Sequence, residues 1–248
     1  MTKRLIVNAD DFGLCEGVND GIVQAHRDGV VTSTTAMVTA PAIQHAVGLS
    51  AEHPALGVGL HFVLSYGKPL TALSSLVREG VLGKWIWEAA AQGELVDEEI
   101  AQELAAQYQR FLSLFGRPPT HIDSHHHVHF IPQVWAQVAK FAWQNDIPLR
   151  IPREEGINAT SVRGTDGFVR DFYGDNVTED FFLQALDSSA SRHERTLEIM
   201  CHPAVVDEVV RQSGYNVERQ TERELLTLPA LKQAIEQRGY QLATYRDI

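Results

Sequence analysis

Five of the chain's 11 histidines fall within residues 121–129, which read His-Ile-Asp-Ser-His-His-His-Val-His. Neutral imidazole is the commonest metal ligand among protein side chains, whereas protonated rings packed together repel one another. A cluster this dense therefore favours a divalent-metal site over a chance grouping of surface histidines.

Two adjacent carboxylates, Asp10 and Asp11, follow a short apolar run at residues 4–7. Such a pair can simply form a turn and cap a helix. If the run is a buried strand, however, two like charges side by side raise one pKa unless a cation takes up the charge. A metal ion resolves the conflict when one aspartate ligates it and the other stays free to act as a base.

Two further histidines, His61 and His202, stand where apolar runs end. His61 follows Gly57 and Gly59, small residues that let a backbone or substrate approach closely. Taken singly, each histidine is more often structural than functional. Together with the aspartates and the cluster they predict metal-assisted hydrolysis, in which a carboxylate takes a proton from water and an imidazolium protonates the departing amine.

Within the cluster, the alternation of side chains along a strand places His121, Asp123 and His125 on one face. His125 stands at the expected strand end and is the best ligand candidate, while Asp123 could orient an imidazole. The histidines beyond the strand cannot all ligate. His129 is therefore expected to be a reserve ligand or a substrate contact.

The elements that must position these residues alternate between apolar runs and helical periods, which predicts βαβ units around a parallel sheet. Strands are expected at 4–7, 31–38, 56–60, 120–124, 148–151, 196–201 and 241–245. Helices are expected at 16–28, from Pro41, and at 97–115, 132–145, 178–188 and 223–238. The candidate residues all lie where a strand ends, the face that carries the chemistry in parallel α/β barrels. Residues 66–96 read as an irregular insertion over one mouth of the barrel.

Composition fits one domain over residues 1–248, with 44% hydrophobic residues and a net charge of −11 from 21 basic and 32 acidic side chains. No basic stripe is visible, which argues against nucleic acid or an anionic membrane as a partner. The two cysteines, Cys15 and Cys201, form no metal-binding or disulfide pattern and suggest a reducing compartment. No signal peptide or membrane-spanning run is recognisable, so a cytoplasmic location is expected.

Aromatic and basic residues near the expected site leave two alternatives open. Tyr66, Trp85 and Trp87 could stack on sugar rings, or could pack the irregular segment onto the barrel. Arg150 and Arg153 could hold a phosphate or sugar oxygens, or could form surface salt bridges.

These residues fall in blocks that resemble the YdjC-type carbohydrate deacetylases, and among them the branch acting on chitin disaccharides in enteric bacteria. The carboxylate block is Leu-Ile-Val-Asn-Ala-Asp-Asp-Phe-Gly-Leu at 5–14, and the histidine block is Asp-Ser-His-His-His-Val-His at 123–129. Further blocks lie at 31–36, 67–72, 80–87 and 200–204, so the resemblance spans nearly the whole chain.

The resemblance implies a distorted (β/α) barrel with seven parallel strands, similar to polysaccharide deacetylases. It implies hydrolysis of an N-acetyl group on N-acetylglucosamine oligosaccharides, namely diacetylchitobiose and its phosphate. It assigns one divalent ion, magnesium or zinc, to Asp11, His61 and His125, with Asp10 as base and His202 as acid. Two imidazoles and one carboxylate suit zinc better than magnesium, which prefers oxygen ligands. Relatives suggest a homodimer.

Two other functions compete with this interpretation. A metallophosphoesterase would normally need two metals and more carboxylates than the sequence offers. A metal-dependent sugar sensor without turnover would show no catalytic deficit when Asp10 or His202 is replaced.

Overall fold

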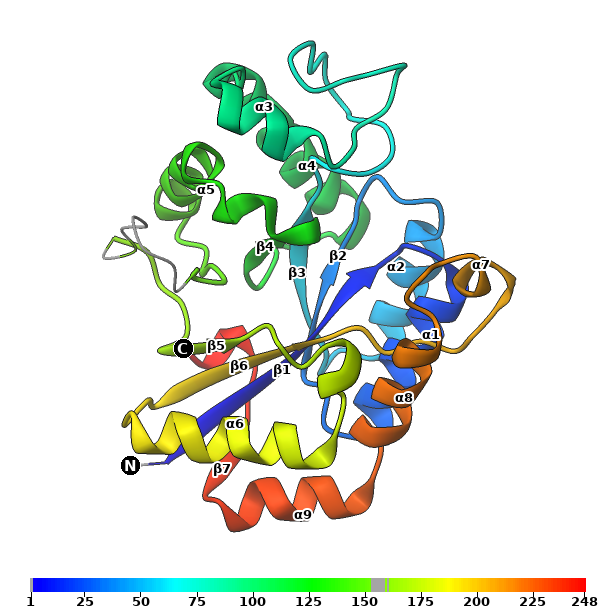
Figure 1. Cartoon of the computed structure of the whole chain (residues 1–248), viewed down its shortest axis with the longest axis vertical. Coiled ribbons are helices and arrows are strands. Elements are labelled where there is room, and N and C mark those ends of the chain that lie inside the picture. Colours follow the sequence, from blue (N-terminus) through cyan, green and yellow to red (C-terminus); the bar gives the residue numbers. More distant parts are fainter. Residues whose placement is uncertain (1, 153–158, 160) are drawn as a thin grey trace.

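The computed structural model describes residues 2–152, 159 and 161–248. Strands and helices alternate along most of this length (Figure 1). The strands are β1 (Lys3–Phe12), β2 (Ser33–Ala36), β3 (Gly57–Phe62), β4 (Ile122–Ser124), β5 (Gly167–Val169), β6 (Thr196–Cys201) and β7 (Tyr240–Leu242). The helices are α1 (Glu16–Arg27), α2 (Ile43–Glu52), α3 (Ile86–Gln92), α4 (Asp97–Phe115), α5 (Pro132–Asn145), α6 (Glu179–Ser191), α7 (Glu208–Arg211), α8 (Val217–Leu226) and α9 (Pro229–Gln237). Short 3₁₀ helices are η1 (His125–Phe130), η2 (Gly174–Asn176) and η3 (Tyr245–Asp247).

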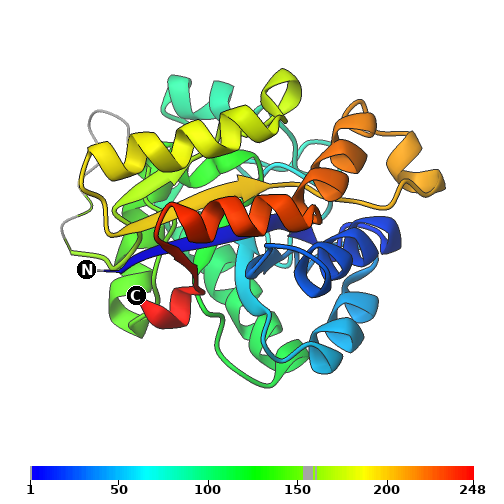
Figure 2. The ribbon, with the colours of Figure 1, turned by 90° about the horizontal axis from the view of Figure 1, so that it is seen from below.

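The strands form one parallel sheet in the order β4-β3-β2-β1-β6-β5, with β7 paired to the first residues of β1. β1 is buried from residue 5 to residue 12, as expected of a parallel strand covered on both faces. Helices surround the curved sheet in both views of the ribbon (Figures 1 and 2). The prediction of an α/β fold with seven parallel strands is confirmed within the described residues.

Several elements begin and end where the sequence predicts, and local signals explain why. α4 ends at Phe115 and is capped by Gly116, whose left-handed φ of 64° suits a residue without Cβ. α5 begins at Pro132, because proline lacks the amide hydrogen that the first turn does not need. No helix among the described residues is both long and apolar enough to cross a membrane.

The predicted strand at 148–151 is wrong. A single parallel bridge joins Leu149 to Ile122, through hydrogen bonds of the Pro148 carbonyl and the Arg150 amide with Ile122 at 2.9 and 3.0 Å. The Leu149 amide points away from β4 and donates to the carbonyl of Arg163 at 2.8 Å, so no continuous strand forms. The fifth strand is β5, which pairs with β6 at the opposite edge of the sheet from β4. The sheet order therefore ends at β4 and β5, as a half-barrel.

The predicted single helix at 223–238 is also wrong. The chain forms α8 and α9 with a break at Thr227 and Leu228, and Pro229 opens the second helix. A proline inside a continuous helix would remove a hydrogen bond and clash with the preceding turn, so two helices are the lower-energy arrangement.

Residues 66–96 contain turns and one short helix, α3. The Trp85 indole donates to the carbonyl of Leu76 at 2.6 Å. Its ring also lies so close to Gly83 that a Cβ there would meet ring carbon at 2.1 Å. Trp85 therefore packs this segment together, which supports the second of its two alternative roles.

Candidate metal centre and active-site pocket

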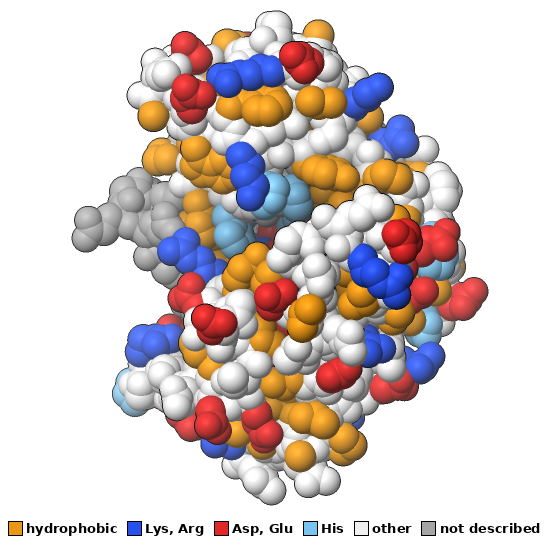
Figure 3. All heavy atoms as spheres, turned by 45° about the vertical axis from the view of Figure 1, so that its right-hand side comes forward, with side chains coloured by type: hydrophobic (Ala, Val, Ile, Leu, Met, Phe, Trp, Pro, Cys, Tyr) orange, Lys and Arg blue, Asp and Glu red, His pale blue; other side chains and the backbone are white. Residues whose placement is uncertain are grey.

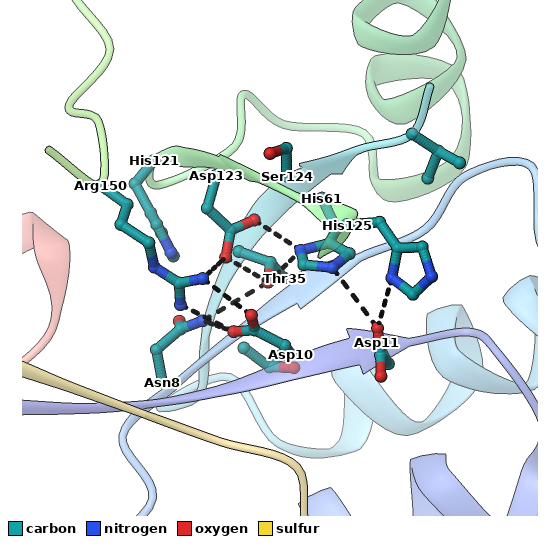
Figure 4. A network of polar contacts seen from close by, with 12 residues as sticks. Asn8, Asp10, Asp11, Thr35, His61, His121, Asp123, Ser124, His125 and Arg150 are labelled. Atoms are coloured by element: carbon teal, nitrogen blue, oxygen red, sulfur yellow. Dashed lines mark hydrogen bonds and ion pairs between the residues drawn. The ribbon is translucent and has the colours of Figure 1, made fainter. Parts of the chain in front are cut away.

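The carboxyl ends of β1, β3 and β4 bring Asp10, Asp11, His61 and His125 together (Figure 4). The fifth candidate, His202, follows β6 and lines the same pocket. Asp10 and Asp11 are consecutive, so a regular strand would point them to opposite faces. Asp11 instead has a left-handed φ of 72°, and the β1–β2 register shifts between Ala9 and Phe12. This irregularity lets both carboxylates line the same pocket.

Asp11, His61 and His125 lie around a common centre. Asp11 Oδ1 accepts a hydrogen bond from His125 Nδ1 at 2.9 Å and lies 3.4 Å from His61 Nε2. One potential ligand atom from each residue lies within 4.8 Å of the others, and all three residues are buried. Two imidazole nitrogens and one carboxylate oxygen are donors that suit a divalent metal ion.

Asp123 orients His61 from behind. Its Oδ1 lies 2.6 Å from His61 Nδ1, and its Oδ2 accepts a hydrogen bond from Thr35 at 2.9 Å (Figure 4). His61 therefore turns Nε2 toward Asp11. Burial opposes a charge on this imidazole, but Asp123 and Asp11 outweigh it and raise the pKa of His61 to about 10. The surroundings thus favour positive charge at this point, whether a proton or a metal ion carries it.

Asp10 is held by Arg150, which is fully buried. The two terminal guanidinium nitrogens donate to the two Asp10 oxygens at 2.7 Å each (Figure 4). The same guanidinium contacts Asp123 at 2.9 Å and Glu198 at 2.8 Å. Burial would raise the pKa of Asp10, yet the charge and hydrogen bonds of Arg150 hold it well below its usual value.

Both alternatives for Arg150, a surface salt bridge and a phosphate contact, are wrong, because its guanidinium faces three buried carboxylates. Arg153 lies outside the described residues.

His202 follows β6 and lines the pocket. Burial and the nearby Arg219 charge outweigh the aspartates and lower the pKa of His202 to about 4, so its imidazole is neutral near pH 7. Its buried Nδ1 has no hydrogen-bond partner within the described residues and lies 4.0 Å from Glu222 Oε1. Burial raises the pKa of Glu222 to about 8. The Tyr215 hydroxyl donates to the same carboxyl at 2.6 Å.

Two buried charged residues on α8, Arg219 and Glu222, belong to the site but were not predicted from the sequence. Arg219 donates to Asp11 Oδ2 at 2.6 Å, while Glu222 accepts from the backbone amide of His202. Charges three residues apart on a helix are usually an exposed pair, and the sequence gives no sign that this pair faces inward. Tyr173 and Tyr215 were not predicted either; their ring centroids lie 4.0 Å apart and their planes are 2° from parallel.

The pocket is a hollow of about 670 Å³, within the range of small-molecule sites. Histidine side chains gather in it, and Lys and Arg side chains lie beside them (Figure 3). Its lining consists of Asp10, Asp11, His61, Lys84, His125, His126, His127, Arg170, Asp171, Tyr173, Met200, His202, Ser213, Gly214, Tyr215 and Arg219. All five candidate residues, namely Asp10, Asp11, His61, His125 and His202, therefore share one cavity.

The three clustered histidines that follow His125 separate into two groups. His126 and His127 line the pocket from left-handed backbone conformations with φ of 54° and 55°. His129 is fully buried, its Nε2 donates to the Arg150 carbonyl at 3.1 Å, and its Nδ1 accepts from Ser124. With both ring nitrogens used, the expected role of His129 as reserve ligand or substrate contact is wrong.

Comparisons with known proteins agree with the resemblance seen in the sequence. A family model described as YdjC-like protein matches residues 4–237. Proteins of Salmonella paratyphi B and Salmonella schwarzengrund, both described as chitooligosaccharide deacetylase, are 56% identical over 252 aligned positions and are covered completely, as is this chain.

Solved structures extend the comparison to the fold. An Enterococcus faecalis protein described as a cellobiose-phosphate cleavage protein has a TM-score of 0.92 at 35% identity, covering 100% of this chain and 99% of that one. A family 4 carbohydrate esterase from Streptomyces lividans, in complex with acetate, has a TM-score of 0.52 at 14% identity over 98% of this chain and 92% of its own. The esterase shares the fold, which confirms the expected polysaccharide-deacetylase-like architecture.

Proposed function

Because the chain belongs to the YdjC-like family, we propose that it is a metal-dependent hydrolase that removes the N-acetyl group from chitin-derived oligosaccharides and releases acetate. One observation carries the proposal above the others. Asp11, His61 and His125 converge on a single centre in a pocket that also contains Asp10 and His202. The Salmonella relatives match this chain over their full length and are described as chitooligosaccharide deacetylases, which supports the proposed type of reaction.

The donor set fits one divalent ion. Asp11, His61 and His125 would hold it, and when bound it would polarise the amide carbonyl and lower the pKa of a water molecule. Two imidazole nitrogens with one carboxylate oxygen suit zinc or another transition metal better than magnesium. Asp123 supports this role, because a carboxylate behind a ligating imidazole fixes which nitrogen faces the ion.

Asp10 is the proposed base. Arg150 keeps it ionised, so it can accept a proton at any pH near neutrality. The same ion pair makes Asp10 a weaker base than an isolated carboxylate, because general-base catalysis is most effective when the pKa lies near the working pH. The fork of Arg150 therefore lowers basicity but fixes the orientation of the carboxylate.

His202 is the proposed acid, although its low pKa leaves it neutral in the free protein. A proton is available nearby, because Glu222 holds one at neutral pH and its Oε1 lies 4.0 Å from His202 Nδ1. If the proton passes from the carboxyl to Nδ1, His202 becomes an imidazolium and can protonate the departing amine from Nε2.

The substrate proposed for the pocket is diacetylchitobiose or its phosphate. Tyr173 lines the pocket, is 46% exposed and is backed by Tyr215, so it offers a rigid aromatic face to a pyranose ring. Lys84 and Arg170 also line the pocket and could face a phosphate group. Tyr66 and Trp87, exposed by 40% and 39%, lie near the rings of His125 and His126 and stay candidates for sugar contacts.

The test is acetate release from diacetylchitobiose and from its phosphate. Wild type, Asp10→Asn and His202→Ala are assayed after chelation and after restoring zinc or magnesium. We expect acetate from the metal-restored wild type and a large loss in both variants. His193→Ala, at an exposed position, is the matched control.

Wild-type rates in the chelated protein or in both variants would contradict the proposal. Sugar binding without acetate would indicate a sensor, and release of inorganic phosphate would indicate a phosphoesterase. A single domain over residues 1–248, a cytoplasmic location and a homodimer stay predictions alongside this function.

A further inference from the structure

The adjacent residues Asp10 and Asp11 each form an ion pair with an arginine, but the two pairs differ in geometry. Arg150 takes both oxygens of Asp10, at 2.7 Å each. Arg219 takes only Oδ2 of Asp11, at 2.6 Å, and leaves Oδ1 to His61 and His125. The pairing thus decides which aspartate has an oxygen available for an ion, and which of its two oxygens that is.

Arg219 is built into this position. It is 7% exposed and lines the pocket, its backbone carbonyl accepts from Ala204 at 3.1 Å, and its guanidinium carbon lies 5.8 Å from the Tyr215 ring. These contacts tie α8 to the segment that follows β6 and limit how far the guanidinium can move. A surface side chain would have no such restraint.

Holding one carboxylate oxygen has a consequence for an ion bound to the other. A carboxylate free to rotate can offer both oxygens and fill a coordination position that a catalytic site needs for water or substrate. A nearby guanidinium also repels a divalent cation and weakens its binding. Both effects lower the affinity for the ion, and the first also keeps a coordination position open.

We propose that Arg219 is a positioning residue that holds Asp11 Oδ2, so that Asp11 offers a bound ion one oxygen and a coordination position stays open. The inference rests on the proposed metal site. It concerns metal binding directly, so it can be tested without reference to deacetylation.

The experiment compares wild type with Arg219→Gln and Arg219→Lys as full-length chelated proteins titrated with Zn²⁺. Arg219→Gln removes the charge and frees Oδ2, so Zn²⁺ should bind about tenfold more tightly. Acetate release should nevertheless fall at least about tenfold, in kcat more than in KM. The Co²⁺ form should lose visible absorption intensity, because higher coordination gives weaker bands. Arg219→Lys keeps a charged donor and should stay within about threefold of the wild-type affinity.

Arg223→Gln is the matched control, because Arg223 lies on the same helix and pairs with Gln24 at 2.9 Å, away from the metal ligands. It should leave Zn²⁺ affinity, the Co²⁺ spectrum and kcat unchanged. Zn²⁺ binding by Arg219→Gln that is equal to or weaker than wild type would overturn the inference, as would an unchanged Co²⁺ spectrum. Tighter Zn²⁺ binding and a changed spectrum in a protein that releases no acetate would uphold it while contradicting the proposed function.

Discussion

Two groups of side chains in the molecule offer similar metal ligands, but only one of them is available to bind an ion. Asp11, His61 and His125 form one; Asp10, Asp123 and the same His61 form the other, and both satisfy the spacing needed for a metal ion. The second group is already occupied by the guanidinium of Arg150. Ligand spacing alone therefore does not define a metal site, because what matters is which cation balances the buried carboxylates.

Glu222 is a third buried carboxylate, and its charge is removed in another way. Glu222 is as deeply buried, but neither a guanidinium fork nor a candidate ion neutralises it, and burial raises its pKa to about 8. It therefore keeps a proton at neutral pH. One protein thus buries carboxylates in three ways: with arginine, with a site suited to an ion, and with a proton.

The largest effect is expected when the guanidinium of Arg150 is removed from the group that contains Asp10 and Asp123. Arg150→Gln removes the guanidinium that Asp10, Asp123 and Glu198 share in the core. We expect a loss of about 3–5 kcal/mol in the free energy of unfolding, because an unpaired buried charge is costly. Denaturant titration near pH 7 measures it.

The control for Arg150 is an exposed ion pair. Arg238 contacts Asp187 at 3.0 Å, with side chains 30% and 61% exposed. Arg238→Gln should cost less than about 1 kcal/mol, because water screens such pairs. Similar losses in the two variants would show that the Arg150 network contributes no special stability.

Substitutions in the group of Asp11, His61 and His125 should change metal affinity more than the free energy of unfolding. His125→Ala removes a proposed ligand, and we expect Zn²⁺ affinity and acetate release to fall by more than about a hundredfold. This loss exceeds the one usually seen when a residue that only hydrogen-bonds to a metal ligand is replaced. Asp123→Asn removes the partner behind His61 and should weaken Zn²⁺ binding about 10- to 100-fold. Calorimetric titration of chelated proteins compares them. Unchanged Zn²⁺ binding in His125→Ala would place the ion elsewhere.

The proton on Glu222 predicts a pH-dependent stability. Because its folded pKa of about 8 lies above its usual value of 4.5, the folded state binds more protons, and this stabilisation is lost as pH rises toward 8. His202, with a folded pKa of about 4, acts in the opposite direction only below its ordinary value of 6.5. Between pH 6.5 and 8 the contribution of Glu222 should therefore decline without that opposition.

Glu222→Gln tests this by removing the titration while keeping a similar shape. Relative to wild type, the variant's free energy of unfolding should fall less between pH 6.5 and 8, by about 1–2 kcal/mol. Taking the difference between the two proteins removes the contribution of His61, which titrates in both. Parallel pH profiles would mean that Glu222 is ionised throughout this range.

Much of this arrangement could be predicted from local signals, and the rest could not. The ends of α4 and α5 follow from Gly116 and Pro132, and the resemblance placed the five candidate residues in one pocket. The break before Pro229 was visible in the sequence, because proline rarely lies inside a helix. The ion pair of Arg150 was not, because its partners Asp10, Asp123 and Glu198 come from three different strands.

The smallest expected effect lies at the pocket wall. Tyr173→Ala removes the exposed ring of the stacked pair and should raise KM for diacetylchitobiose about five- to tenfold, with kcat within about twofold, because stacking contributes about 1 kcal/mol. Tyr173→Phe keeps the ring and should stay close to wild type. Trp143→Ala is the matched control, since Trp143 is an exposed aromatic residue on α5 outside the lining of this pocket and should leave KM unchanged. An equal increase in KM for Trp143→Ala would mean that the sugar does not use the Tyr173 ring, and the stacked pair would then serve only to hold Glu222 beside His202.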